Sequence, residues 1–163
     1  VGAIPPVMGW TAAGGNPWDV EAIILGSTLY LWQFPHFFAL SFMHRVDYRR
    51  GGFVMVPCFD EERASRLVVR YAWYLSTIPL VATAMDVTST MFAMEGFLLN
   101  GYALYVAKAF EDDRTNANAR RVFLTSLWYL PSLLMLFLLH SKTWDTLPET
   151  NNQQQLNNNT NNN

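Results

Sequence analysis

Long apolar runs make up most of the chain, and short polar segments separate them. Residues 22–43 contain a single residue of the Asp, Glu, Lys, Arg or His types, His36, and residues 122–139 contain none. An apolar run of about 17 to 25 residues is long enough to cross the hydrocarbon core of a membrane as a helix. The pattern therefore predicts a membrane-spanning helix in each of these two runs.

Two further apolar runs, residues 67–85 and 91–110, carry a few charges. Arg70, Glu95 and Lys108 lie near the ends of these runs. A long charged side chain near the end of a span can reach the membrane surface while its stem stays in the apolar layer. We therefore expect four spans, and an all-α, polytopic membrane protein.

The two ends of the chain differ from the body between them. The apolar opening, residues 1–13, has the pattern of the end of another span, so we expect the chain to be a fragment of a longer protein. Residues 142–163 form a polar tail rich in Asn and Gln that cannot bury a core. These patterns predict a membrane domain over residues 1–141, followed by a disordered tail.

The basic residues are gathered in two of the segments between the runs. Six of the 11 lie between Arg45 and Arg70 and four between Lys108 and Arg121, whereas the turns around residues 14–21 and 86–90 have none. Four spans place both basic segments on one face, which the positive-inside rule assigns to the cytoplasm or to the mitochondrial matrix. A soluble helical bundle is the alternative, but it requires polar helix faces, and residues 122–139 offer almost none.

Charge and cysteine content exclude two classes of function. The net charge of −2, with the arginines localised, gives no electrostatic footprint for nucleic acid. The single cysteine, Cys58, excludes an intrachain disulfide framework and supplies no paired thiolate ligands.

Polar residues recur along the first span and continue past its end. If residues 31–52 form one helix, five positions fall on one face at steps of three and four residues. These positions are Gln33, His36, Leu40, His44 and Asp47. Pro35 can kink the helix beside this face, and the two glycines at residues 51–52 should end the helix. Such a polar stripe is typical of a helix that lines a hydrated or ligand-filled cavity.

The segment after the first span combines basic groups with one carboxylate. Arg45, Arg49 and Arg50 offer planar donors to phosphate or carboxylate oxygens, and Asp47 offers an oxygen ligand to a hard cation such as Mg²⁺. The alternative to a binding site is that these charged residues form a solvated cluster next to the membrane. For His36, the alternative to a role in function is a structural hydrogen bond to a neighbouring helix. The acidic residues at 60–62 are interpreted as the charged start of a following helix.

Four stretches carry a resemblance to a known family. They are "VGAIPPVMGWTAA", "LYLWQFPHFFALSF", "DYRRGGFVMVP" and "ARRVFLTSLWYLPSLLML", in this order along residues 1–141. With them the chain resembles the protohaem IX farnesyltransferase (haem O synthase) branch of the UbiA superfamily of intramembrane prenyltransferases. "WQFPHF" followed closely by the Asp-Tyr-Arg-Arg-Gly stretch is the most specific part of the match. The chain departs from the branch at Val46, where an acidic residue is common, and at Phe38, where a polar one is frequent.

The resemblance implies a helical membrane fold of which this chain holds the last four spans and part of a fifth. It implies transfer of a farnesyl group from farnesyl diphosphate to a vinyl group of haem b, giving haem O, with Mg²⁺ as cofactor. It also implies that a first Asp-rich metal motif lies upstream of Val1. On this basis Asp47 and His44 are the expected catalytic residues, Asp47 an expected metal ligand, and the expected substrate-binding residues are Gln33, His36, Arg45, Tyr48, Arg49 and Arg50.

Several alternatives stay open at the level of sequence. They are a prenyltransferase for another acceptor, a haem-binding membrane protein without enzymatic activity that uses His36 and a second imidazole as axial ligands, and a transporter or channel. The expected location is the mitochondrial inner membrane or a bacterial plasma membrane. The sequence leaves the oligomeric state open.

Overall fold

The computed structural model describes residues 2–141, and the regular elements in this range are all helices. This confirms the expected all-α class. The elements are α1 (Ile4–Ala12), α2 (Val20–Met43), α3 (Arg45–Arg50), α4 (Val56–Phe59), α5 (Glu61–Ser76), α6 (Ile78–Ala84), α7 (Thr90–Asp112) and α8 (Asn116–Leu139). The predicted tail, residues 142–163, lies outside the described residues, and its structure stays a prediction.

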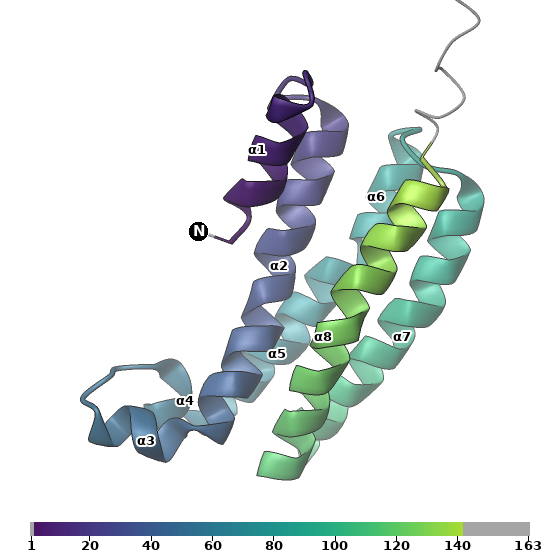
Figure 1. Ribbon diagram of the computed structural model, residues 1–163. Helices are drawn as coiled ribbons and strands as arrows, with labels where there is room; N and C mark the ends of the chain where they lie inside the picture. The colour runs from purple at the N-terminus through teal and green to yellow at the C-terminus, as the bar shows by residue number, and fades with distance from the viewer. Residues whose placement is uncertain (1, 142–163) are drawn as a thin grey trace, which may run out of the picture.

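The long helices lie side by side as a bundle (Figure 1). Helix α2 packs against α5 and α8, and α7 packs against the same two helices from the other side. The first and last long helices are therefore neighbours, and the bundle closes on itself. Helix α1 packs against the first half of α2, outside this ring.

Three segments within the described residues are long and apolar enough to cross a membrane. They are residues 20–43, 61–84 and 116–139, and they include three of the four predicted spans. Helix α7 is 23 residues long and runs beside the other three, but it is not among these segments. The fourth span, over residues 91–110, therefore stays a prediction, which its position in the bundle supports.

The span predicted over residues 67–85 consists of two helices rather than one. Helix α5 ends at Ser76 and α6 begins at Ile78, with Thr77 between them. Pro79 has no N–H to donate to the carbonyl group four residues earlier, so the backbone ladder is interrupted here. The Thr77 hydroxyl donates to the Tyr74 carbonyl oxygen at 2.7 Å and satisfies one of the carbonyl groups at the end of α5.

Apolar side chains cover the outside of the bundle as well as its interior. The interior holds two hydrophobic clusters, one around Phe92, Tyr129 and Leu133 and the other around Phe42 and Phe110. On the outer surface the exposed side chains of the long helices include Met94, Phe97, Leu98, Leu124, Leu127, Met135 and Leu138. A soluble bundle would carry polar residues there, so the exterior fits a lipid environment.

Both basic segments lie at the same end of the bundle. The connection through α3 and α4 and the connection from α7 to α8 are at the lower end in Figure 1. The α1–α2 and α6–α7 connections and the end of α8 are at the upper end. The alternation expected from the positions of the arginines and lysines is therefore confirmed, and the assignment of the lower end to the cytoplasmic or matrix face stays a prediction of the positive-inside rule.

Candidate functional site

The helix predicted over residues 31–52 is interrupted at His44. Helix α2 ends at Met43, His44 has φ −103° and ψ 18°, and α3 begins at Arg45. The prediction of one continuous helix is therefore wrong at this point. The predicted end is confirmed, because Gly51 caps α3 and Gly52 has a φ of +76°, a conformation that favours glycine.

The side chain of Arg45 holds the helix junction against two other elements. Its Nε donates to Glu61 Oε1 at 2.7 Å, and its Nη1 donates to Asn116 Oδ1 at 2.7 Å and to the Phe42 carbonyl oxygen at 2.9 Å. Glu61 begins α5 and Asn116 begins α8. The guanidinium group thus joins three helix ends at the basic face.

A hollow opens beside this junction. It is lined by Leu40, His44, Asp47, Tyr48 and Phe53. His44 Nδ1 and Asp47 Oδ2 lie 4.0 Å apart, and their side chains are 55% and 75% exposed, so both are open to a ligand. The structure therefore brings together the two expected catalytic residues and one expected substrate-binding residue.

Arg49 and Arg50 follow on α3. The Arg49 guanidinium donates to the carbonyl oxygen of Cys58, which ties α3 to α4. Arg50 is exposed, at the end of α3, and makes no hydrogen bond or ion pair within the described residues. Of the three arginines in this segment, Arg50 is therefore the most available to an incoming anion.

The remaining two predicted residues lie deeper along α2 and point in different directions. The side chain of Gln33 lies toward α1, since a Cβ added at Gly2 would be 3.3 Å from Gln33 Oε1. His36 faces α8, where its Nδ1 lies 2.8 Å from the Ser126 hydroxyl. The predicted polar stripe is thus divided. Gln33 lies toward α1 and His36 toward α8, whereas Leu40, His44 and Asp47 line the hollow.

The acidic residues nearby do not complete a metal site. The Asp60 carboxylate accepts a hydrogen bond from the Arg63 N–H at 2.7 Å and caps α5, which confirms the predicted helix start at residues 60–62. Within residues 2–141 there is no group of three or more His, Cys, Asp or Glu side chains that could hold a metal ion. Mg²⁺ is usually bound through one or two carboxylates together with substrate phosphates and water, and Asp47 supplies one carboxylate at the hollow.

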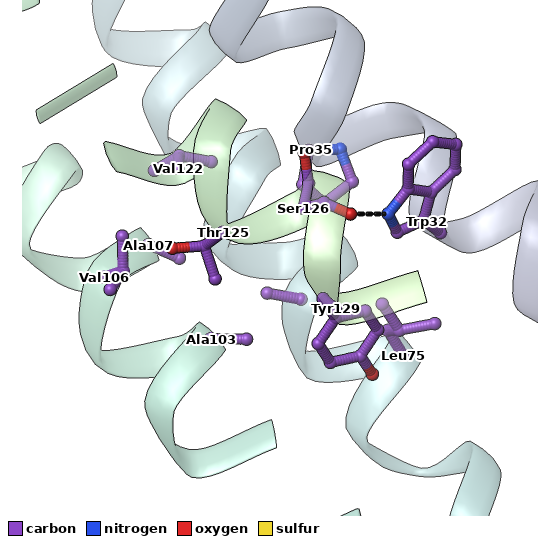
Figure 2. Close-up of a pocket in the computed structure, with 11 residues that line it drawn as sticks. Trp32, Pro35, Leu75, Ala103, Val106, Ala107, Val122, Thr125, Ser126 and Tyr129 are labelled. Carbon is purple, nitrogen blue, oxygen red and sulfur yellow. Dashed lines mark hydrogen bonds between the residues drawn. The ribbon is translucent and has the colours of Figure 1, made fainter. Parts of the chain in front are cut away.

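A small cavity lies among α2, α5, α7 and α8 (Figure 2). Its wall includes Trp32, Pro35, Thr125, Ser126 and Tyr129, and its volume is about 30 Å³. Trp32 Nε1 donates to the Ser126 carbonyl oxygen at 2.8 Å, which is the dashed line in Figure 2. Trp32 and Ser126 were not among the predicted site residues. The sequence signal that could have indicated Ser126 is the pair of adjacent hydroxyl residues, Thr125 and Ser126, within the apolar run 122–139.

The three histidines of the chain are far apart. His36 and His44 are eight residues apart, which is about 12 Å along a helix axis. His140 follows α8 at the opposite end of the bundle. Two imidazoles from this chain therefore do not meet on one haem iron, which argues against the bis-histidine alternative.

Comparison with known protein families shows to which family the chain belongs. The family described as the UbiA prenyltransferase family matches residues 1–140. The chain belongs to the UbiA prenyltransferase family. Its membership confirms the family resemblance and the expected type of membrane fold.

Named relatives of this UbiA family member come from mitochondria and from bacteria. Protoheme IX farnesyltransferase, mitochondrial, of Homo sapiens is 44% identical over 138 residues, which cover 85% of this chain and 31% of the relative. The Arabidopsis thaliana protein of the same name is 39% identical over 96% of the chain and 35% of the relative. Protoheme IX farnesyltransferase 1 of Chromobacterium violaceum is 37% identical over 85% of the chain and 46% of the relative.

The chain spans about a third of the length of the mitochondrial relatives that it matches. The names of the relatives cover both locations expected from the sequence, the mitochondrion and the bacterial cell. No solved structure matches the structure of this UbiA family member.

Proposed function

We propose that this chain belongs to an enzyme that transfers a farnesyl group from farnesyl diphosphate to a vinyl group of haem b, giving haem O. The observation that carries the proposal is the hollow at the basic end of α2, which combines the apolar side chains of Leu40 and Phe53 with the polar groups of His44, Asp47 and Tyr48. A prenyl diphosphate has the same division into an apolar chain and a charged head. The names of the relatives support haem as the acceptor.

The polar rim of the hollow is suited to the diphosphate. Arg50 is exposed beside it, and the guanidinium of Arg49 lies on the same short helix. Guanidinium groups form bidentate, charge-assisted hydrogen bonds with phosphate oxygens. We assign Arg49, Arg50 and Tyr48 to the leaving group, while Arg45 shapes the site through the contacts that hold the helix ends together.

The reaction requires that the bond between the first farnesyl carbon and the diphosphate oxygen breaks, and its electron pair leaves with the diphosphate. The vinyl π electrons of haem b then form the new carbon–carbon bond, and water adds to the resulting cation and releases a proton. Groups positioned where charge develops stabilise such a step. We assign to His44 the donation of a hydrogen bond to a diphosphate oxygen; Asp47 Oδ2 lies 4.0 Å from His44 Nδ1, and both residues line the hollow.

A role for Asp47 in binding Mg²⁺ depends on ligands outside this chain. Asp47 is the one carboxylate among the lining residues of the hollow, and the described residues contain no group of three or more His, Cys, Asp or Glu side chains that could hold a metal ion. We propose Asp47 as one oxygen ligand, with the remaining carboxylates contributed by the part of the full-length protein that this chain does not span. Gln33 and His36, deeper along α2, are assigned to binding of the acceptor.

An activity assay on the full-length protein tests the proposal. Membranes containing the wild type, haem b, farnesyl diphosphate and Mg²⁺ should form haem O, detected by mass. Asp47→Ala should lower the rate by roughly 100-fold or more, since it removes a group that acts at the developing charge. Glu62→Ala is the matched control, because Glu62 is an exposed carboxylate at the same face, and within residues 2–141 its side chain pairs with Arg66 alone, at 3.1 Å.

The outcomes separate the open alternatives. Wild type that prenylates a different acceptor keeps the prenyltransferase function and refutes haem as the substrate. Wild type that binds haem and transfers no prenyl group supports the haem-binding alternative. Equal rates for the two carboxylate variants would remove Asp47 from the catalytic machinery.

A further inference from the structure

The imidazole ring of His36 is held between two aromatic side chains. The ring centroid lies 4.7 Å from that of Trp32, with the planes 22° apart, and 4.8 Å from that of Phe123, with the planes 30° apart. Trp32 is itself fixed by its hydrogen bond to the Ser126 carbonyl oxygen. Because both faces of the imidazole are covered, only its edge is available to another group.

The hydrogen bonds of Ser126 determine which nitrogen of His36 carries the proton. The Ser126 hydroxyl lies 2.6 Å from the Phe123 carbonyl oxygen, which can only accept, so the single hydroxyl hydrogen is used there. The contact of 2.8 Å between Ser126 Oγ and His36 Nδ1 then requires Nδ1 to be the donor. In the neutral imidazole the other nitrogen, Nε2, is left with its lone pair.

The second nitrogen of His36 faces open space. Nε2 makes no hydrogen bond within residues 2–141. The enclosed side-chain nitrogen and oxygen atoms in this range that lack a partner are Ser89 Oγ and Glu95 Oε2, and Nε2 is not among them. The wall of the bundle therefore presents a fixed lone pair in apolar surroundings, where a polar group without a partner is unfavourable.

We propose that Ser126 is a positioning residue that presents His36 Nε2 as an axial ligand to the iron of the haem substrate. Histidines that bind metals donate their other ring N–H to an oxygen atom, which fixes the tautomer and the ring orientation, and Ser126 supplies this oxygen. Haem iron readily accepts an imidazole nitrogen. The inference rests on the proposed function, because the iron belongs to the acceptor in that reaction.

The position of His36 relative to the hollow fits this role. Leu40, which lines the hollow, follows His36 by one helical turn on α2, a rise of about 6 Å. A porphyrin whose iron is bound at His36 extends several ångströms from the metal to its vinyl groups. Ligation at this site therefore directs an edge of the acceptor toward the place where we put the farnesyl diphosphate.

Resonance Raman spectroscopy of the full-length protein with ferrous haem b tests the inference. The wild type should show an iron–histidine stretching band, and His36→Ala should lose it. His36→Ala should also lose any preference for haem b over metal-free protoporphyrin IX. Ser126→Ala should move the band to lower frequency, since the N–H group loses its acceptor, and should weaken haem binding roughly 10-fold to 100-fold, as expected for an outer-shell partner.

Two further variants separate positioning from packing. Ser126→Thr keeps the hydroxyl, and the adjoining cavity of about 30 Å³ offers room for the added methyl group, so the band should stay at its wild-type position. Thr125→Val removes the neighbouring buried hydroxyl, which also lines the cavity but does not contact His36, and should leave the band unchanged.

The possible failures are distinguishable when haem O formation is measured on the same preparations. Wild type that makes haem O without an iron–histidine band, or a band that survives His36→Ala, overturns this inference and leaves the proposed function standing. A band that does not respond to Ser126→Ala overturns the positioning role. Wild type that neither binds haem nor makes haem O overturns both proposals.

Discussion

Asn100 and Tyr129 form a side-chain hydrogen bond inside the bundle, within its apolar core. The Tyr129 hydroxyl donates to Asn100 Oδ1 at 2.7 Å, and Asn100 Nδ2 donates to the Gly96 carbonyl oxygen at 2.7 Å. Both residues are buried, so neither polar group has access to water. The pair fixes the rotation of α7 relative to α8 and illustrates how the bundle satisfies the few polar side chains in its interior.

Replacing Tyr129 by Phe should destabilise the protein by about 1 kcal/mol, the usual size of an interhelical hydrogen bond in a membrane protein. The measurement is reversible unfolding of the full-length protein in mixed micelles. Tyr102→Phe is the matched control on α7, because Tyr102 is half-exposed and its ring packs against Trp128. Equal losses for the two variants would mean that the Asn100–Tyr129 bond contributes nothing specific.

At the level of single residues, the sequence predicted which polar residues of one segment lie together, but not the hydrogen-bond partners of these residues on other helices. Their spacing put His44 and Asp47 on one helix face, and they do share a hollow. The partner of His36 is Ser126, 90 residues away, and that of Arg45 is Asn116, 71 residues away. Helical periodicity relates residues within one helix and contains no information on which helix lies opposite.

Arg45 acts at the level of elements, because it joins the end of α2 to the starts of α5 and α8. Its side chain is 24% exposed and that of Glu61 is 42% exposed, so the pair is partly shielded from water. A guanidinium with three acceptors holds a geometry that an ammonium group on a flexible chain does not reproduce. These contacts lie at the junction of α2 and α3, where the hollow also lies.

Arg45→Ala should therefore release α3 and α4 from the bundle and cost roughly 1 to 2 kcal/mol in the free energy of unfolding. Hydrogen exchange should accelerate over residues 45–59, where the backbone amides would open more often. Arg50→Ala, an exposed arginine on the same helix, should leave the exchange rates unchanged. Unaltered exchange in Arg45→Ala would show that the α2–α3 junction is held by something else.

A close approach between α7 and α6 depends on a glycine. A Cβ added at Gly96 would lie 2.7 Å from Pro79 Cγ and 2.8 Å from Pro79 Cβ, and the proline ring is rigid and buried. On the same helix, a Cβ added at Gly101 would meet nothing within 4 Å. The two glycines therefore form a natural pair for testing helix packing.

Gly96→Ala should destabilise the protein by about 1 to 3 kcal/mol, because the added methyl group forces the two helices apart. Gly101→Ala should be neutral or stabilising by up to about 1 kcal/mol, since alanine favours the helix. Thermal unfolding of the two variants side by side measures the difference. A neutral Gly96→Ala would mean that α6 moves away from α7 without cost.

The boundaries of the elements were only partly predictable from the sequence. The apolar runs at 22–43 and 122–139 correspond to α2 and α8, because a long run of apolar residues is a local property. The breaks at His44 and Thr77 were not predicted as helix ends. The residue after His44, Arg45, contacts helices that come later in the chain, and a local sequence pattern contains no information on such contacts.

At the scale of the whole molecule, the arrangement makes a prediction about sidedness. Both basic connections lie at one end of the bundle, and the α1–α2 and α6–α7 connections lie at the other. The charge pattern alone predicted this alternation, because the distribution of Lys and Arg reflects how spans are inserted. The fold class was therefore predictable from the sequence, whereas the closed order of the four helices was not.

Cysteine labelling of the full-length protein in sealed vesicles checks this sidedness. In a Cys58→Ala background, cysteines introduced at Arg50 and Arg114 should react with an impermeant reagent from the same side. Cysteines at Ala13 and Met85, both exposed in the other two connections, should react from the opposite side. Labelling of positions 50 and 114 from opposite sides would contradict the four-span arrangement.

The closed ring of helices also has a consequence for synthesis on the ribosome. Helix α2 emerges early, but Ser126, which accepts the hydrogen bond from His36, is made 90 residues later. At about 5 to 20 residues per second, the delay is roughly 5 to 20 seconds. During that interval the imidazole and the Trp32 indole lack their partners, so the insertion machinery or surrounding membrane proteins must shield this face of α2 until α8 arrives.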